Sequence, residues 1–155
     1  MDEPEFERFY RATAGRLRAY LYRVCGDRRL VDDLLQEAFY RFLRSKFAGG
    51  GEEERARYLF RIATNLLRDH WAESKRSREL PPEPASTGTD ETRMDLHATL
   101  GALKATDREM LWLAYAEGCS HAEIAEILEV KRASVRVLLF RARARLVALL
   151  KGDEG

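Results

Sequence analysis

The spacing of apolar residues along the 155-residue chain is helical almost throughout. Apolar side chains recur three or four positions apart from Phe6 to Val24, and again within residues 28–46 and 54–76. This period is typical of amphipathic helices with one buried stripe. No stretch alternates apolar and polar residues as a half-buried strand does. The pattern predicts an all-α protein that begins with a three-helix unit over residues 1–76.

Signals of helix ends follow in the second half of the chain. Thr106 and Glu109 have the spacing of a capping box, which predicts a helix beginning at Thr106. Gly118 then offers a left-handed exit from that helix. Ser120 and Glu123 repeat the capping-box spacing, so a second, short helix is expected directly after the turn.

The last predicted helix begins at about Arg132, after a turn at residues 129–131. On a wheel at about 100° per residue, one apolar arc lies between two groups of arginines. The arc can pack on the two preceding helices, so residues 98–151 form a predicted helix-turn-helix unit. The arc consists of Val135, Leu138, Leu139, Ala142, Leu146 and Leu149, and the arginine groups are Arg132, Arg136 and Arg143 on one flank and Arg141 and Arg145 on the other.

Residues 77–97 interrupt this helical texture. They contain three of the four prolines, several Ser, Thr and Gly residues, and few apolar side chains. Such a composition predicts a flexible linker. The expected architecture is therefore two small helical domains, residues 1–76 and 98–151, that move relative to each other.

Charge separates along the C-terminal unit, although the net charge of the chain is only +1. Residues 107–129 hold six acids and one base, whereas residues 130–151 hold seven bases and no acid. A concentrated positive charge on the last helix is typical of a helix that binds a polyanion. A solvated basic face is the plainer interpretation. Because capping, turn length and charge agree, DNA binding is favoured.

The second helix combines an apolar half, which includes Leu43, with a polar face. Asp33, Gln36, Glu37 and Tyr40 cluster on that polar face. The adjacent carboxylates of Asp32 and Asp33 point about 100° apart in a helix, and no histidine or third carboxylate joins them. An acid/base pair or a metal site is therefore not expected here. Periodicity leaves two interpretations equally open, a solvated acidic face and a docking face for a basic partner.

The third helix carries basic residues interleaved with aromatics and an amide. This composition suits melted nucleic acid, because bases stack on rings while phosphates meet arginines. A surface stripe beside core aromatics is the alternative, and Trp71 in particular lies near the apolar arc. The polar side is expected to contain Arg57, Arg61, Thr64, Asn65 and Arg68, with Tyr58 and Asp69 at its edge.

Composition argues against several other classes of protein. The three histidines are scattered without metal-ligand spacing, and no nucleophile–base arrangement or glycine-rich nucleotide fingerprint is present. We therefore expect no catalytic residues, metal, cofactor or small-molecule substrate. No apolar run reaches the roughly 18 residues of a membrane span, so no membrane insertion is expected. Two distant cysteines, Cys25 and Cys119, predict a reduced, cytoplasmic location.

Three motifs resemble those of bacterial sigma factors. Asp33 to Phe39 (D-L-L-Q-E-A-F) resembles their D-L-V-Q-E-x-F signature, and Tyr58 to Trp71 (Y-L-F-R-I-A-T-N-L-L-R-D-H-W) resembles their promoter-melting helix. Gly118 to Leu146 resembles the helix-turn-helix of their fourth conserved region. Because the motifs occur in order with only a linker between the two units, the chain resembles the extracytoplasmic-function (ECF) subgroup.

The resemblance implies a protein that binds core RNA polymerase and directs it to promoter DNA, and that is not itself an enzyme. An anti-sigma protein is a further implied partner. The alternative is a stand-alone helix-turn-helix regulator. The implied polymerase-binding residues are Asp32, Asp33, Gln36, Glu37 and Tyr40; those at the downstream, melted element are Tyr58, Arg61, Asn65, Arg68, Asp69 and Trp71; those at the upstream element are Lys131, Arg132, Ser134, Arg136, Arg141 and Arg143.

The chain departs from the family pattern in its last helix. The family often has Ser-Arg-Leu where this chain has Val137-Leu138-Leu139. Leu138 thus replaces a usual basic contact, and it either packs into the core or meets a partner. Tyr58 stands where a tryptophan is common, which keeps an aromatic ring.

Overall fold

Every element that the structure describes is helical. The computed structural model describes residues 1–45, 47, 50–77 and 102–152. Within these ranges it contains six α-helices, one π-helical turn and no strand. The predicted all-α fold is confirmed.

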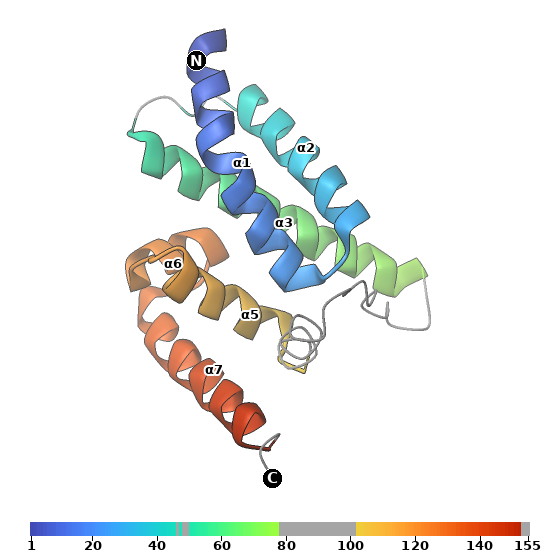
Figure 1. Cartoon of the computed structure of the whole chain (residues 1–155), viewed down its shortest axis with the longest axis vertical. Helices are drawn as coiled ribbons and strands as arrows, with labels where there is room; N and C mark the ends of the chain where they lie inside the picture. The colour runs from blue at the N-terminus through green and yellow to red at the C-terminus, as the bar shows by residue number, and fades with distance from the viewer. Residues whose placement is uncertain (46, 48–49, 78–101, 153–155) are drawn as a thin grey trace. The chain divides into compact units, whose positions relative to one another are not determined.

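The chain divides into two compact units between Glu83 and Pro84. The predicted linker, residues 77–97, lies outside the described residues apart from Ser77. The N-terminal unit holds nearly all of α1 (Glu3–Cys25) together with α2 (Arg28–Arg44) and α3 (Glu52–Ser77), and the C-terminal unit holds α5 (Ala105–Leu111), η1 (Trp112–Ala116), α6 (His121–Leu128) and α7 (Arg132–Gly152) (Figure 1).

The turn between α1 and α2 is built by a glycine and a cap. Gly26 adopts φ +71°, a conformation that favours glycine. Asp27 then caps α2, its side chain accepting hydrogen bonds from the amides of Arg29 at 3.1 Å and Leu30 at 3.3 Å. These two residues explain why α2 begins where the sequence predicts.

Aromatic rings hold α1 against the other two helices of its unit. The ring of Phe9 stacks on that of Phe42 with centroids 4.9 Å apart, and Tyr20 meets Phe60 at 5.2 Å. Such contacts add to the burial of large apolar surfaces. Leu43 was predicted to join this core but is exposed. It lies about 100° around the helix from Phe42 and close to the end of α2, beyond the reach of the facing helices.

Thr64 does not lie on the polar face of α3, where the sequence predicted it. The residue is fully buried rather than exposed. Its hydroxyl donates to the carbonyl oxygen of Phe60 at 2.8 Å and lies 2.8 Å from the Tyr20 hydroxyl. Because threonine can satisfy its hydroxyl within its own helix, it can face a core that periodicity assigns to apolar residues.

The start of the C-terminal unit also differs from the prediction. Helix α5 begins at Ala105, with Lys104 in extended conformation as N-cap and no side-chain cap. Thr106 therefore lies inside the first turn and is exposed, and the predicted capping box with Glu109 does not form. Glu109 is instead buried. The box fails because the chain enters the helix too early for Thr106 to act as its cap.

The end of this first helix widens into a π-turn, which the sequence did not predict. The Glu117 amide donates to the Trp112 carbonyl at 3.1 Å, and the Cys119 amide donates to the Leu113 carbonyl at 2.9 Å. Gly118 has φ +67°, which confirms the predicted left-handed exit.

The second capping box is confirmed. The Glu123 amide donates to Ser120 Oγ at 3.2 Å, and the Ser120 amide donates to Glu123 Oε1 at 2.8 Å. Glu129 ends α6 with φ 55°, and α7 begins at Arg132 as predicted. Together these caps define the tight turns of the helix-turn-helix.

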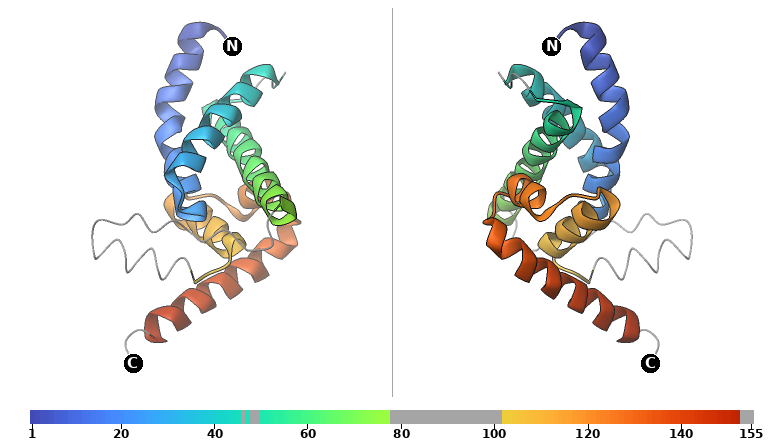
Figure 2. Two further views of the ribbon diagram at one scale, coloured as in Figure 1. Left: turned by 90° about the vertical axis from the view of Figure 1, so that its right-hand side faces the viewer. Right: turned by 90° about the vertical axis from the view of Figure 1, so that its left-hand side faces the viewer.

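Helix α7 is uninterrupted over its whole length (Figure 2). Val135, Leu139 and Ala142 are its buried residues, and α7 contacts both α5 and α6. At its edge, Arg145 Nη1 donates to both carboxylate oxygens of Asp107, at 2.9 and 3.1 Å. Arg145, predicted to be part of a free basic flank, is therefore used to hold α7 against α5.

We expect Ser120→Ala to loosen α6, because it removes one half of the capping box. Amides of α6 should exchange with deuterium about fivefold faster, the equivalent of about 1 kcal/mol. Ser134→Ala, the same change within α7, is the matched control. Equal exchange in wild type and Ser120→Ala would contradict this account of the turn.

We expect Arg145→Ala to lower the free energy of unfolding of the C-terminal unit by about 1–2 kcal/mol. The Asp107 carboxylate is almost buried and would lose this partner, while the exposure of Arg145 limits the effect. Denaturation followed by Trp112 fluorescence, with Trp71→Phe in all variants, measures this unit. The exposed Arg141→Ala should change the value by less than about 0.5 kcal/mol. Equal effects of the two arginines would show that the ion pair contributes nothing.

Candidate functional site

The first candidate surface is the acidic face of α2. Its five members are exposed, whereas the opposite side of the helix is buried. Asp32 forms an ion pair with Arg18, and Glu37 accepts from Arg41 at 3.0 Å. Exposed pairs of this kind contribute about 0–1 kcal/mol, so a basic partner can replace them at low cost. The face consists of Asp32, Asp33, Gln36, Glu37 and Tyr40.

Asp33 lies between these pairs without an ion pair among the described residues. Near the end of the face, the Arg44 guanidinium lies 5.5 Å from the centroid of the Tyr40 ring. A cation over an aromatic face is weakly attractive and limits the rotation of the ring. The face thus offers carboxylates, an amide and an oriented phenol along one side of a single helix.

The second candidate surface follows α3. Tyr58, Arg61, Asn65 and Arg68 lie three or four residues apart, so they form one stripe, and all four are half-buried. Trp71 is also half-buried, while Asp69 is exposed. The structure therefore brings the predicted residues of this helix together, apart from the buried Thr64.

The ring of Tyr58 is not free on this surface. It stacks on Phe47 with centroids 4.7 Å apart and an interplanar angle of 11°, and it also lies 6.1 Å from Phe42. The sequence analysis treated Tyr58 as an edge residue and missed its ring partners. Phe47 covers one face of the Tyr58 ring, and the residue remains half-buried at the surface.

The third candidate surface is the basic part of α7 and the turn before it. The predicted basic residues of this surface are all exposed, while Ser134 is half-buried. Arg143 Nη1 also donates to the hydroxyl of Tyr115 in η1 at 3.0 Å. The exposed basic residues are Lys131, Arg132, Arg136, Arg141 and Arg143.

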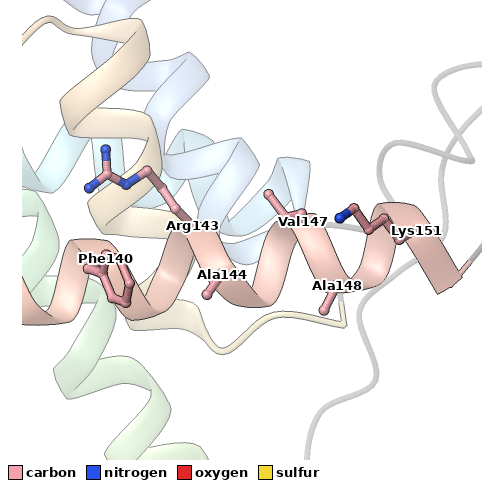
Figure 3. A pocket seen from close by; sticks show the side chains of 6 residues that line it. All are labelled: Phe140, Arg143, Ala144, Val147, Ala148 and Lys151. Atoms are coloured by element: carbon pink, nitrogen blue, oxygen red, sulfur yellow. The ribbon is translucent and has the colours of Figure 1, made fainter.

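Sequence reasoning missed the exposed apolar residues of α7. Phe140 is 66% exposed, and Val137 and Val147 are each 47% exposed. Further along the helix, Phe140, Ala144 and Val147 line a shallow depression together with Arg143, Ala148 and Lys151 (Figure 3). A helical wheel could have predicted this exposure, because Val137, Phe140 and Val147 lie opposite the apolar arc that packs inward. Leu138 is half-buried, so it contributes to the edge of the core.

No group of three or more His, Cys, Asp or Glu side chains in the described ranges is placed to hold a metal ion. No helix in the part of the chain that the structure describes is long and apolar enough to cross a bilayer.

The two units match two family models. Residues 9–77 match the Sigma-70 region 2 model, and residues 93–146 match the model of Sigma-70, region 4. The fold is also similar to two solved structures, each with a TM-score of 0.70. One contains the sigma factor RpoE with the anti-sigma factor NepR from Bartonella quintana, at 22% identity over 96% of this chain and 98% of that one. The other is the PhyRSL-NepR complex from Sphingomonas sp. Fr1, at 18% identity over 91% and 86%.

Curated relatives extend the similarity to sequence. The ECF RNA polymerase sigma factor SigE of Mycolicibacterium smegmatis is 34% identical over 92% of this chain, which spans 60% of the length of that relative. EcfG, an ECF RNA polymerase sigma factor of Rhodopseudomonas palustris, is 30% identical, with 88% of this chain and 80% of the relative covered. The RNA polymerase sigma factor CarQ of Myxococcus xanthus is 30% identical, with 94% and 88% covered. The chain belongs to the family of ECF RNA polymerase sigma factors.

Proposed function

We propose that this chain binds core RNA polymerase and directs it to specific promoters. The observation that carries the proposal is the presence, on one chain, of an exposed acidic helix in a region 2 unit and an exposed basic helix in a region 4 unit. The first face suits a basic protein surface and the second suits DNA. The role is regulatory, and the chemistry of RNA synthesis remains with the polymerase.

The acidic face of α2 is the proposed docking surface for the polymerase. Its carboxylates reach solvent from a helix whose other side is fixed in the core by Leu34, Leu35 and Ala38. Rigid support of this kind limits the entropy lost on binding. Asp33 is the proposed centre of the contact, because no ion pair with a described residue has to be broken there.

We expect Asp33→Arg to abolish co-elution of the purified chain with core polymerase, because like charges would then meet at the interface. Glu7→Arg reverses an exposed acid on α1 and is the matched control, with binding expected to remain. Circular dichroism should be unchanged in both variants. A folded Asp33→Arg protein that still co-elutes would sink the docking assignment.

The stripe on α3 is the proposed contact with the melted strand of the downstream promoter element. Arg61 and Arg68 are placed to meet phosphates on either side of Asn65, whose amide can hydrogen-bond a base that has left the stack. The half-buried rings of Trp71 and Tyr58 would offer stacking surfaces, and the exposed Asp69 lies beside the stripe. These side chains come from one helix, so their spacing is fixed before DNA arrives.

We expect Asn65→Ala to reduce promoter opening about tenfold while binding to core polymerase is retained. The loss corresponds to the removal of a hydrogen bond to an extruded base, which is worth about 1–3 kcal/mol. Permanganate reactivity of thymines in the opened region measures the effect. His70→Ala, at an exposed position of the same helix, should open the promoter normally. If both variants behave alike, Asn65 has no specific role in melting.

The helix-turn-helix is the proposed reader of the upstream element, which remains duplex. The N-terminal residues of its second helix would enter the major groove. Arg132, Ser134 and Arg136 would lie nearest the bases, and Lys131, Arg141 and Arg143 would contact the DNA beside them.

We also propose that an inhibitor protein binds this chain. The RpoE structure from Bartonella quintana contains an anti-sigma factor, and the fold of that complex resembles this one. Such a protein would act by covering the polymerase and DNA surfaces described above. A promoter-directing role also requires the cytoplasmic location that the cysteine usage predicts. A stand-alone regulator, by contrast, would bind duplex DNA tightly without polymerase.

A further inference from the structure

We propose that Ala133, Val137 and Phe140 recognise thymine methyl groups in the upstream promoter element. The inference rests on the proposed function, because it concerns how the helix-turn-helix selects its DNA. It assigns a part of the sequence specificity to apolar side chains, in addition to the base-edge contacts proposed for the basic residues beside them.

The first step is the orientation of α7. Burial of Val135, Leu139 and Ala142 fixes which side of the helix faces the core. Ala133, Val137 and Phe140 are four and three residues apart and lie on the opposite side, so they form one exposed stripe. This stripe occupies the outermost line of the helix.

The stripe also lies at a suitable position along α7. The stripe lies in the first nine residues of α7, the part of a recognition helix that contacts base edges. Seven residues separate Ala133 from Phe140, a rise of about 11 Å, which is close to the roughly 12 Å width of the major groove. Val147 lies another 11 Å or so further along, beyond the groove.

The charged residues of α7 that flank the stripe indicate what it contacts. Every charged residue of α7 is basic, and the stripe runs between Arg132 and Arg136 on one flank and Arg141 on the other. Pairing with a second copy of the same helix would therefore bring like charges together. A polyanion whose charged walls flank a floor with exposed methyl groups fits the arrangement, and the major groove of DNA has this character where thymines line it.

The final step is the chemistry of the groove floor. The C5 methyl of thymine is the apolar group that the bases expose in the major groove, and other edge groups donate or accept hydrogen bonds. Valine and phenylalanine side chains cannot satisfy those groups, so covering them is unfavourable. Covering a methyl is favourable by about fourfold in affinity. The stripe should therefore select thymine at the positions it faces.

Deoxyuridine provides the test, because it lacks only the methyl group of thymine. Each thymine of the upstream element, on either strand, is replaced in turn, and run-off transcription by the full chain with core polymerase is measured at limiting chain. We expect about fourfold less transcript at one or two positions. Val137→Ala should lose sensitivity to one of these replacements. Val147→Ala is the matched control, with the same exposure on α7 but outside the groove, and should keep the wild-type pattern.

Three other outcomes are distinguishable. Transcription that is unaffected by every replacement would overturn the inference and leave the proposed function intact. No transcription on any template would count against the proposed function itself. Equal losses for Val137→Ala and Val147→Ala, whatever the base, would show that a protein covers the exposed side of α7 from Val137 to Val147, and would contradict the DNA assignment.

Discussion

The rotation of α7 about its own axis is the constraint on which the C-terminal unit depends. Three small or medium apolar residues, Val135, Leu139 and Ala142, bury one side of this helix against α5 and α6. The ion pair between Arg145 and Asp107 holds the same rotation from the edge. Because a helix presents each residue at a fixed angle, this burial also determines which arginines and which apolar side chains reach solvent. Burial in the core and the proposed recognition of DNA thus both follow from one packing arrangement.

In the N-terminal unit, too, the residues that pack the core differ from those proposed to bind partners. Helices α2 and α3 each bury one side and present a polar stripe, and the exposed stripe of α2 contributes little to stability. The ion pairs on α2 are exposed and weak, whereas the ring contacts around Phe42 and the hydrogen bond between Tyr20 and Thr64 lie in the core. The proposed binding residues of α2 can therefore be changed without loss of core contacts, which is why charge reversal at Asp33 is expected to separate binding from stability.

Local sequence predicted the features that local interactions determine. The turn at Gly118, the Ser120 capping box and the start of α7 depend on residues a few positions apart, and all were predicted. The box at Thr106 failed because the helix begins earlier, and Thr64 was placed on the wrong side because its hydroxyl finds partners that periodicity does not register. The pairing of Arg145 with Asp107 joins residues 38 positions apart, which local sequence does not reveal. The position of Phe140 on the helical wheel was also available from the sequence. Its exposure could be interpreted only once the buried side of α7 was known.

Run-off transcription on a pool of random promoter templates tests the central claim most directly. Purified chain is added to bacterial core polymerase, and core polymerase alone is the control. The account predicts discrete start sites that appear only when the chain is present, with shared sequence elements upstream of them. A chain that binds core polymerase and yields no such start sites would contradict promoter selection, and a chain that binds duplex DNA tightly but not core polymerase would be a stand-alone regulator.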